Sequence, residues 1–314
     1  MSSTGNKKQR LAHVVSVQQF TDKKLLAKLF TRADELQAQA PSDYPKPLQH
    51  LTFATVFYEP STRTRLSFET AIQNLGGHLI TVENAGDFSS AKKGESLEDT
   101  IRTINAYADG IVLRHPEKGA AKRAADVSSA PVINAGDGTG EHPTQALLDI
   151  YTIVRERGTL DGLKIALVGD LLNGRTVHSL LPLFAPYNVE LYLIAPDSLQ
   201  LPKQFTDELK RAGIAFHKLD NWDTIIDKVD ILYMTRVQKE RFPLIEDYLA
   251  VKDSFILTLP LARKMKTGAR ILHPLPRVNE IAIEVDADSR ALYFQQVKNG
   301  LYLRMALLEH LFTA

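Results

Sequence analysis

The sequence predicts an α/β protein with two doubly wound parallel-sheet domains joined by an interdomain helix. Three observations support this prediction. The chain has 314 residues, which at roughly 150 residues per domain suggests two domains. Short runs rich in Val, Ile, Leu and Tyr alternate with longer segments whose apolar residues recur at helical spacing. The strand-like runs are almost continuously apolar, as expected of parallel strands that helices cover on both faces.

The strand candidates fall into two groups. The first half holds four, at residues 51–58, 78–83, 110–115 and 131–135. The second half holds five, which begin at Lys164 (KIALVGD), Val189 (VELYLIAP), Asp230 (DILYMTR), Ser254 (SFILT) and Arg270 (RILHP). A helix over 142–156, ended by Gly158, bridges the two groups. The segment from Ser289 onward has helical spacing interrupted at Asn299-Gly300, which predicts two helical pieces.

These elements divide the chain into a first domain over residues 1–143 and a second over 144–297. A C-terminal helix at 298–314 is expected to pack back on the first domain. The hinge between the two domains is expected near the bridging helix.

The composition excludes several classes of protein. Lys and Arg total 38 against 37 for Asp and Glu, so the chain lacks the basic field of nucleic-acid binders and the polybasic anchor of membrane-surface proteins. The absence of cysteine removes disulfides and thiolate chemistry. No apolar run approaches the ~20 residues of a membrane span, and the opening MSSTGNKKQR is polar. We therefore expect a cytoplasmic protein without nucleic-acid or membrane partners.

The residues just after each strand indicate the site, because ligands of doubly wound sheets bind beyond the carboxyl ends of the strands. The segment EPSTRTR at 59–65 follows the first strand and leads into a helix, for which Ser61 is a natural N-cap. The turn adds further hydroxyl and guanidinium groups, those of Thr62, Arg63, Thr64 and Arg65. The alternative is a capped helix with surface arginines, but capping explains Ser61 alone. The pattern favours a phosphate site at the positive end of the helix.

The third and fourth strands bring further candidates to the same edge. Arg114 and His115 end the third strand, and a glycine-rich turn after the fourth leads to His142 and Gln145. A spacing of three places both of these side chains on one face of the first helical turn. A lone histidine is more often structural than catalytic. Beside Arg114 and the phosphate site, His142 becomes a catalytic candidate.

The second half contains a near match to a nucleotide-binding loop. GDLLNGRT at 169–176 fits the pattern G-x-x-x-x-G-K-[ST] except that Arg175 replaces the lysine. A nucleotide hydrolase would also need a carboxylate for magnesium after a second strand, whereas MTRVQKER supplies Arg236 and Gln238 there. Forked guanidinium groups suit carboxylate ligands. A phosphate- or nucleotide-binding module, or an inactive relative, remains the alternative from a different class.

Two other segments are uninformative by themselves. SSAKKGES at 89–96 reads as a solvated loop, and the prolines of HPLPR at 273–277 fix a backbone path. Paired carboxylates of glycosidases, an H-E-x-x-H helix and a G-x-S-x-G elbow are absent from the sequence. The nine scattered histidines predict no metal site.

Taken together, six motifs in order resemble the catalytic chain of the aspartate carbamoyltransferase family. They are STRTR at 61–65, RHP at 114–116, HPTQ at 142–145, GRTVHS at 174–179, MTRVQKER at 234–241 and HPLPR at 273–277. The first and third mark carbamoyltransferases in general, and the last two point to the aspartate branch. The ornithine branch typically has a cysteine in the turn that corresponds to HPLPR, and this chain has none. A carbamoyltransferase with another amine acceptor is the second hypothesis.

The resemblance implies an enzyme that transfers the carbamoyl group from carbamoyl phosphate to the α-amino group of L-aspartate. The products would be N-carbamoyl-L-aspartate and phosphate, in de novo pyrimidine biosynthesis. It implies a phosphate site at Ser61, Thr62, Arg63 and Thr64. It implies polarisation of the carbamoyl oxygen by Thr64, Arg114 and His142, and binding of the carbamoyl nitrogen by Gln145 and the backbone carbonyls around Leu275 and Pro276. The aspartate carboxylates would bind Arg175, Arg236 and Gln238, with no metal or organic cofactor.

The resemblance also implies an assembly. Ser89 and Lys93 match positions at which a neighbouring subunit completes each active site in the family, so the active unit would be a homotrimer with shared sites. Residues 1–143 would bind carbamoyl phosphate and 144–297 would bind aspartate. The chain departs from common family residues at Pro60, Leu172 and Asn173. A regulatory subunit and a multienzyme context are not predicted from the sequence.

Overall fold

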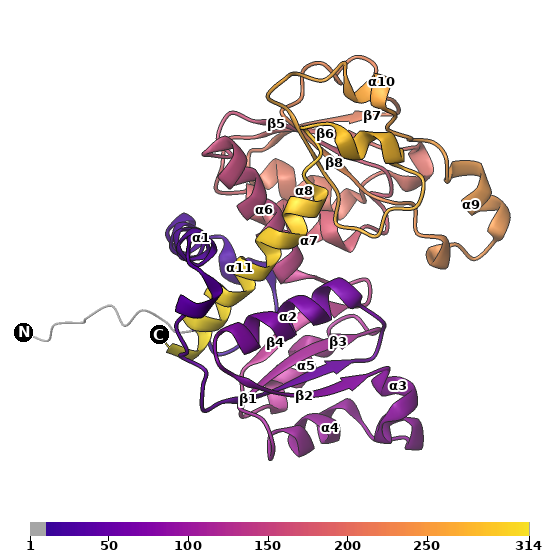
Figure 1. Cartoon of the computed structure of the whole chain (residues 1–314). Helices are drawn as coiled ribbons and strands as arrows, with labels where there is room; N and C mark the ends of the chain where they lie inside the picture. Colours follow the sequence, from indigo (N-terminus) through magenta and orange to yellow (C-terminus); the bar gives the residue numbers. More distant parts are fainter. Residues whose placement is uncertain (1–10, 314) are drawn as a thin grey trace, which may run out of the picture. The chain divides into compact units, whose positions relative to one another are not determined.

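The computed structural model describes residues 11–313, which form two compact units (Figure 1). Of the described residues, unit 1 comprises 11–16, Lys28–Gly138 and 301–313. Unit 2 comprises Val17–Ala27 and Thr139–Gly300. The opening segment MSSTGNKKQR lies outside the described residues. Within residues 11–313, none of the helices combines the length and the apolarity that crossing a bilayer requires.

Unit 1 is built on a parallel sheet with the strand order β2-β1-β3-β4. Its strands are β1 (Thr52–Phe57), β2 (His78–Glu83), β3 (Gly110–His115) and β4 (Val132–Asp137). The chain moves outward from β1 to β2 and then returns to the other side of β1 with β3. The carboxyl ends of β1 and β3 therefore form the switch point of this sheet, where ligands of such folds bind.

Helices cover both faces of the unit 1 sheet, as the almost continuously apolar strands predicted. The Thr55 hydroxyl of β1 donates to Glu69 Oε1 of α2 (Thr62–Asn74) at 2.9 Å. On the opposite face, Ala54 and Val56 belong to a buried cluster with Ile101 of α4. Figure 1 shows α2 on one side of the strands, with α4 (Leu97–Ile104) and α5 (Ala120–Val127) on the other.

Unit 2 is built on a parallel sheet with the order β7-β6-β5-β8-β9. Its strands are β5 (Lys164–Val168), β6 (Glu190–Ile194), β7 (Ala215–Leu219), β8 (Ile231–Met234) and β9 (Arg270–Leu272). The switch point of this sheet lies between the carboxyl ends of β5 and β8, since β6 and β7 extend to one side and β8 and β9 to the other. The predicted fold class of two doubly wound parallel sheets is confirmed.

The remaining elements connect and cover these sheets. The helices are α1 (Lys23–Ala38), α3 (Ala85–Phe88), α6 (Pro143–Arg157), α7 (Arg175–Phe184), α8 (Lys203–Arg211), α9 (Ile245–Val251), α10 (Leu259–Ala262) and α11 (Tyr293–Thr313). Single 3-10 turns are η1 (Val17–Phe20), η2 (Pro41–Asp43), η3 (Ser90–Lys93), η4 (Asp197–Leu199), η5 (Lys239–Arg241) and η6 (Ile283–Ala287). Helix α6 matches the predicted bridging helix, with Pro143 in its first turn and Gly158 as a left-handed C-cap at φ 78°.

Two predicted elements are wrong. The run SFILT is not a strand, because Leu257 makes only an isolated bridge to Ile281 and the position beside β8 belongs to β9. The C-terminal segment is one helix, α11, and does not break at Asn299-Gly300. Buried Asn299 donates from Nδ2 to Thr152 Oγ1 at 3.0 Å and accepts from Gln295 Nε2 at 2.9 Å. These bonds and the surrounding packing outweigh the cost of a helical glycine, about 1 kcal/mol.

One strand escaped the sequence pattern. Strand β7 reads AFHKL, is short and lies at the edge of its sheet. Most of its residues are exposed, so it lacks the continuous apolar run that identified the central strands. Polar edge strands of this kind resist pairing with other chains.

Candidate active site

The first group of candidate residues surrounds the amino end of α2, directly after β1. Ser61 is the N-cap residue as predicted, but its hydroxyl makes no capping hydrogen bond. Thr62 and Arg63 are exposed, whereas Thr64 is 6 % exposed. The backbone N–H groups of this first helical turn give it a partial positive charge. The arrangement can bind a phosphate through backbone, hydroxyl and guanidinium donors.

Arg65 is paired with carboxylates of the protein. Its Nη2 lies 3.1 Å from Glu83 Oε2 at the end of β2, and its Nη1 lies 3.6 Å from Glu69 Oε1 one turn along α2. Two carboxylates therefore already compensate the Arg65 charge, so its guanidinium is directed to the protein.

Arg114 lies beside this turn because β1 and β3 are neighbours. The sheet register pairs Phe57 with Arg114, and the N–H of Tyr58 donates to the Arg114 carbonyl at 2.9 Å. The Arg114 Nε lies 3.4 Å from Glu59 Oε2, and Nη1 donates to the Ala135 carbonyl at 3.3 Å. These contacts hold a largely buried guanidinium at the switch point of the unit 1 sheet.

His115 next to it is not an anion ligand. Its Nδ1 accepts a hydrogen bond from the N–H of Glu117 at 3.1 Å. Burial lowers the pKa of His115 below its ordinary value, more than the neighbouring carboxylates raise it. The ring is therefore neutral near pH 7 and supports the turn after β3.

Ser89 and Lys93 lie in the segment between β2 and α4, which forms short helical turns. The Ser89 hydroxyl donates to the Ala85 carbonyl and accepts from the N–H of Ala91 at 3.1 Å. Lys93 ends η3 and is exposed. Gly94 follows with a left-handed φ of 92°, which reverses the chain toward α4. Lys93 thus projects from the surface of unit 1.

The loop after β5 is fixed by a buried carboxylate that sequence analysis missed. Asp170 has 0 % exposure and accepts from the N–H of Asn173 at 2.8 Å and from that of Gln238 at 3.4 Å. The Gln238 amide in turn donates to the Asn173 carbonyl at 3.1 Å. Burial raises the pKa of Asp170, although these hydrogen bonds oppose the shift. The network ties the GDLLNGRT loop to the segment after β8.

This tie brings the aspartate-site candidates to one switch point. Arg175 is the first residue of α7, after β5, and Arg236 follows β8, whose register pairs Met234 with Val168. The Arg236 Nη1 donates to Glu240 Oε2 at 3.1 Å. Arg175, Arg236 and Gln238 thus all follow the carboxyl ends of β5 and β8, as predicted.

His142 and Gln145 begin α6. His142 is the N-cap residue, is 4 % exposed, and its N–H donates to Ser179 Oγ at 3.0 Å. The Gln145 Nε2 donates to Asp149 Oδ1 at 2.8 Å. Helix α6 therefore carries both side chains in its first turn, on unit 2.

The HPLPR turn follows β9 and is held by a buried histidine. The N–H of Leu275 donates to His273 Nδ1 at 2.7 Å, and His273 Nε2 lies 2.7 Å from Glu280 Oε1. Because Nδ1 accepts, the proton of the neutral ring sits on Nε2 and is donated to Glu280. Burial raises the pKa of Glu280, but His273 and backbone N–H groups outweigh it, and the net direction is downward.

The backbone of this turn is unusual. Leu275 has a positive φ of 56°, and the Leu275-Pro276 peptide bond is cis. Residues other than glycine rarely adopt a left-handed φ. Positions that do so cluster at ligand-binding and active sites, where the surrounding structure fixes the backbone. The turn presents its carbonyl groups in one defined arrangement.

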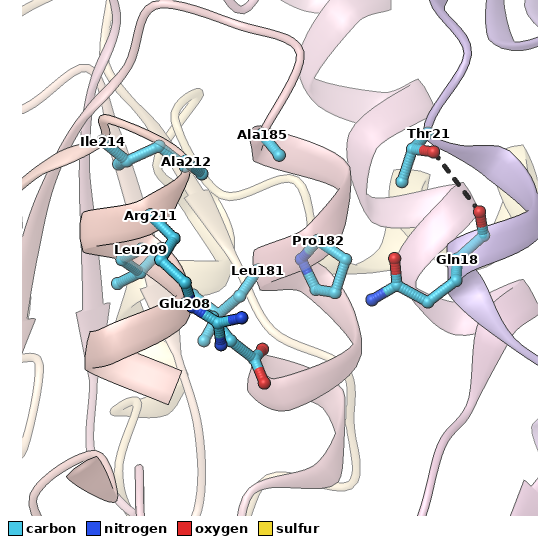
Figure 2. A pocket seen from close by; sticks show the side chains of 10 residues that line it. All are labelled: Gln18, Thr21, Leu181, Pro182, Ala185, Glu208, Leu209, Arg211, Ala212 and Ile214. Atoms are coloured by element: carbon cyan, nitrogen blue, oxygen red, sulfur yellow. Dashed lines mark hydrogen bonds between the residues drawn. The ribbon is translucent and has the colours of Figure 1, made fainter. Parts of the chain in front are cut away.

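Two hollows of unit 2 lie apart from these residues. One, with a volume of about 420 Å³, lies between η1, α7 and α8 and has Gln18, Pro182 and Glu208 in its wall (Figure 2). Another, of about 540 Å³, is lined by Arg263 and Arg290 among others. Neither contains a predicted site residue. Across residues 11–313, no three His, Asp or Glu side chains group as a metal site would require.

The chain matches two family models along most of its length. Residues 12–155 match the model described as aspartate/ornithine carbamoyltransferase, carbamoyl-P binding domain. Residues 161–311 match the model described as aspartate/ornithine carbamoyltransferase, Asp/Orn binding domain.

Curated relatives agree with these matches. A chloroplastic aspartate carbamoyltransferase of rice is 50% identical over 96% of this chain and 85% of its own length. An aspartate carbamoyltransferase catalytic subunit of Thermococcus kodakarensis is 49% identical over 94% of this chain and 95% of its own. A multifunctional protein of Dictyostelium discoideum is 50% identical, but the match covers 14% of its length.

Solved structures give the same result. The catalytic subunit of M. jannaschii aspartate transcarbamoylase superposes with a TM-score of 0.88 at 46% identity, covering 96% of this chain and 98% of that one. The Trypanosoma cruzi aspartate transcarbamoylase in complex with N-(phosphonacetyl)-L-aspartic acid superposes with a TM-score of 0.88 at 39% identity, covering 95% and 97%. Both likenesses extend over both units.

Proposed function

This chain belongs to the aspartate/ornithine carbamoyltransferase family, and from that premise we propose how its residues perform the reaction. The reaction is the transfer of a carbamoyl group from carbamoyl phosphate to L-aspartate. It forms N-carbamoyl-L-aspartate and phosphate, in pyrimidine biosynthesis. The α-amino nitrogen attacks the carbamoyl carbon, and the bond from that carbon to the phosphate oxygen then breaks.

One observation supports the assignment of residues: the candidates follow the carboxyl ends of the strands, and most lie at the two switch points. We assign the phosphate to Ser61, Thr62, Arg63 and Thr64 at the amino end of α2. We assign the carbamoyl oxygen to Thr64, Arg114 and His142, whose donors would stabilise the oxyanion of the tetrahedral intermediate. Preorganised donors of this kind each lower the barrier by a few kcal/mol.

The second substrate needs groups that bind two carboxylates. We assign them to Arg175, Arg236 and Gln238, with Lys93 as an additional cation. The guanidinium groups match carboxylates in shape and charge. The carbamoyl nitrogen would donate to the Gln145 amide oxygen and to the carbonyls of Leu275 and Pro276. The leaving phosphate would accept the amine proton, so the proposed steps use only protein and substrate groups.

We propose that the active form is a homotrimer in which Ser89 and Lys93 enter the site of a neighbouring subunit. Exposed apolar residues on unit 1 support an interface there: Leu66 on α2 is 49% exposed, and Ile80 and Val82 on the edge strand β2 are 41% and 36% exposed. A partner copy would cover this edge. The domain assignment, carbamoyl phosphate to residues 1–143 and aspartate to 144–297, is part of the same proposal.

The shared site has a direct test. Lys93→Ala and His142→Ala trimers, each nearly inactive, are mixed, dissociated and allowed to reassemble. If each site takes Lys93 and His142 from different subunits, about a quarter of the sites regain both residues. Activity would rise to about that fraction of wild type. No recovery from trimers shown by mass to be mixed would contradict the sharing.

We also propose a cytoplasmic location, because a chain without cysteine needs no oxidising compartment. The rice and Arabidopsis relatives are named chloroplastic. Fractionation of the source cells with antibody detection tests the location, and recovery with an organelle fraction would overturn it.

The assignment of substrates is tested by steady-state product formation without added metal. L-aspartate and L-ornithine are supplied in parallel with carbamoyl phosphate. We expect product with L-aspartate and none with L-ornithine, and we expect Arg236→Ala to raise the KM for aspartate. A preference for ornithine would overturn the assignment of Arg236.

A further inference from the structure

A buried carboxylate outside the proposed ligand set lies at the centre of unit 2. Asp149 of α6 is 0% exposed. Its Oδ1 accepts from Gln145 Nε2 at 2.8 Å and also from Gln296 Nε2, and its Oδ2 accepts from the Tyr233 hydroxyl at 2.7 Å. Burial, followed by the charge of Asp149, raises the pKa of Tyr233 well above its ordinary value. The phenol therefore stays protonated and donates.

The carboxylate decides which way the Gln145 amide faces. An ionised carboxylate has acceptors only, so the amide must present its NH2 group to Asp149 and not its oxygen. Reversing the amide would place its oxygen against the carboxylate, with repulsion in place of a charge-assisted bond. The Gln145 oxygen is thereby turned away from Asp149. In that direction it can accept a hydrogen bond from a ligand that has a donor.

The same carboxylate orients a second amide that supports the HPLPR turn. Gln296 donates its NH2 to Asp149, which leaves its oxygen to accept from the N–H of His273 at 3.1 Å. His273 Nδ1 then accepts from the N–H of Leu275 at 2.7 Å. A continuous set of hydrogen bonds thus runs from Gln145 through Asp149 and Gln296 to the turn around Leu275.

We propose that Asp149 is a positioning residue that makes the site selective for a carbamoyl NH2 group. By fixing the Gln145 oxygen and the Leu275 turn as acceptors, it favours a phosphate ester whose acyl carbon carries N–H donors. An acyl phosphate with a methyl group at that position would leave these acceptors without a donor, which a buried site penalises. The inference rests on the proposed contact between Gln145 and the carbamoyl nitrogen. Asp149 itself touches no substrate in this account.

The test compares carbamoyl phosphate with acetyl phosphate, which has a methyl group in place of the NH2. The measured quantity is the ratio of the acetyl phosphate inhibition constant to the carbamoyl phosphate KM, with inorganic phosphate as a probe of the phosphate site alone. Asp149→Asn removes the charge that fixes the amide, and Asp149→Ala removes both acceptors. We expect the ratio to fall about tenfold in each, as for the loss of one hydrogen bond to a ligand, with phosphate inhibition unchanged.

Tyr233→Phe is the matched control. It removes a donor from the same buried carboxylate and costs stability, but leaves the bond from Gln145 to Asp149 in place. We expect its selectivity ratio to equal that of the wild type. An unchanged ratio in both Asp149 variants, or an equal fall in Tyr233→Phe, would overturn the proposal.

Gln145→Ala separates the inference from the proposed function beneath it. If Gln145→Ala lowers the ratio and the Asp149 variants do not, the substrate contact stands and the role of Asp149 fails. If Gln145→Ala also leaves the ratio unchanged, the proposed contact with the carbamoyl nitrogen is itself wrong. Asp149→Asn is nearly isosteric, so it provides the decisive measurement if Asp149→Ala does not fold.

Discussion

Arg114 and Glu59 lie side by side at the switch point of the unit 1 sheet, with 3.4 Å between Nε and Oε2. The pair joins a residue that follows β1 to a residue near the end of the neighbouring strand β3, since Phe57 of β1 pairs with Arg114. The Arg114 side chain is 13% exposed and that of Glu59 is 32% exposed. This pair and the bond from Nη1 to the Ala135 carbonyl fix the guanidinium at the carboxyl end of β3.

Replacing Arg114 should damage the chemical step more than the fold. Arg114→Ala is expected to lower kcat about 100- to 1000-fold, because it removes a preorganised donor to the oxyanion. Arg102→Ala is the control, since Arg102 is exposed and paired only locally with Asp99. Steady-state kinetics with a thermal unfolding curve for each variant checks this. Wild-type turnover in a folded Arg114→Ala would contradict the assignment.

The two arginines of the STRTR segment should differ in effect. Arg63→Ala is expected to raise the KM for carbamoyl phosphate and the phosphate inhibition constant at least about tenfold, through loss of a charged hydrogen bond. Arg65→Ala, which breaks the pairs with Glu69 and Glu83, should mainly lower the melting temperature. Inhibition by phosphate and thermal unfolding measure the two effects. The opposite pattern would mean that Arg65 is the anion ligand.

Replacing Arg236 should weaken the binding of aspartate and leave the binding of phosphate unchanged. Arg236→Ala is expected to raise the KM for aspartate about 10- to 100-fold, since it removes a charged partner of a carboxylate. Phosphate inhibition should not change. Arg263→Ala is the control, because Arg263 is exposed near α10. Equal effects of Arg236→Ala on both substrates would indicate a general structural defect.

Gly169→Ala should destabilise the protein. Gly169 has a φ of 113°, and a Cβ there would lie 2.2 Å from the Thr235 carbonyl oxygen. The left-handed backbone and the clash should together lower the free energy of unfolding by about 2 kcal/mol or more. Gly162→Ala, also at positive φ but with no atom within 4 Å of the Cβ, measures the backbone part alone. Urea denaturation compares them, and equal losses would exclude the clash.

Stability should fall as the pH drops below about 6.5. Burial lowers the pKa of His13, His115 and His310 below their ordinary 6.5, so the unfolded chain binds protons there that the native chain does not. The contribution of these histidines to stability is therefore fully present above about pH 6.5 and is lost as the pH falls toward their lowered native pKa values. His115→Asn keeps an acceptor without this titration and should weaken the dependence between pH 6.5 and 5. If the melting temperature changes with pH to the same extent in both proteins, the prediction is wrong.

Much of the fold was predictable because its central strands are buried on both faces. Strands β1, β3, β5 and β8 are almost continuously apolar and fall within the predicted segments. Strand β7 was missed because an edge strand needs few apolar residues. SFILT was wrongly predicted to be a strand. An apolar run indicates that a segment is buried, but it does not indicate which segment it pairs with. Leu257 is buried, yet it bridges to Ile281 outside the sheet.

Most candidate ligands were found from the sequence because they lie at or just after the ends of strands, whereas Ser89 and Lys93 came only from the family resemblance. The carboxylates that hold these ligands in place were not found from the sequence. Asp149 and Asp170 contribute nothing to a motif of anion ligands, and their roles depend on donors distant in the chain, such as Tyr233 and Gln238. These partners can be identified only from the structure, in which β8 lies beside β5.

The chain segments that make up the two units determine the order in which each unit can be completed during synthesis on the ribosome. Unit 1 needs the residues from Leu301 onward, whereas unit 2 needs nothing beyond Gly300. Leu303, Leu307 and Leu311 of α11 are at most 1% exposed, so the early part of unit 1 lacks these core residues until they are translated. We therefore expect unit 1 to mature last, although its whole sheet, β1 to β4, emerges first. The nascent β1–β4 sheet would keep apolar surface uncovered through most of synthesis, which is the kind of surface that chaperones bind.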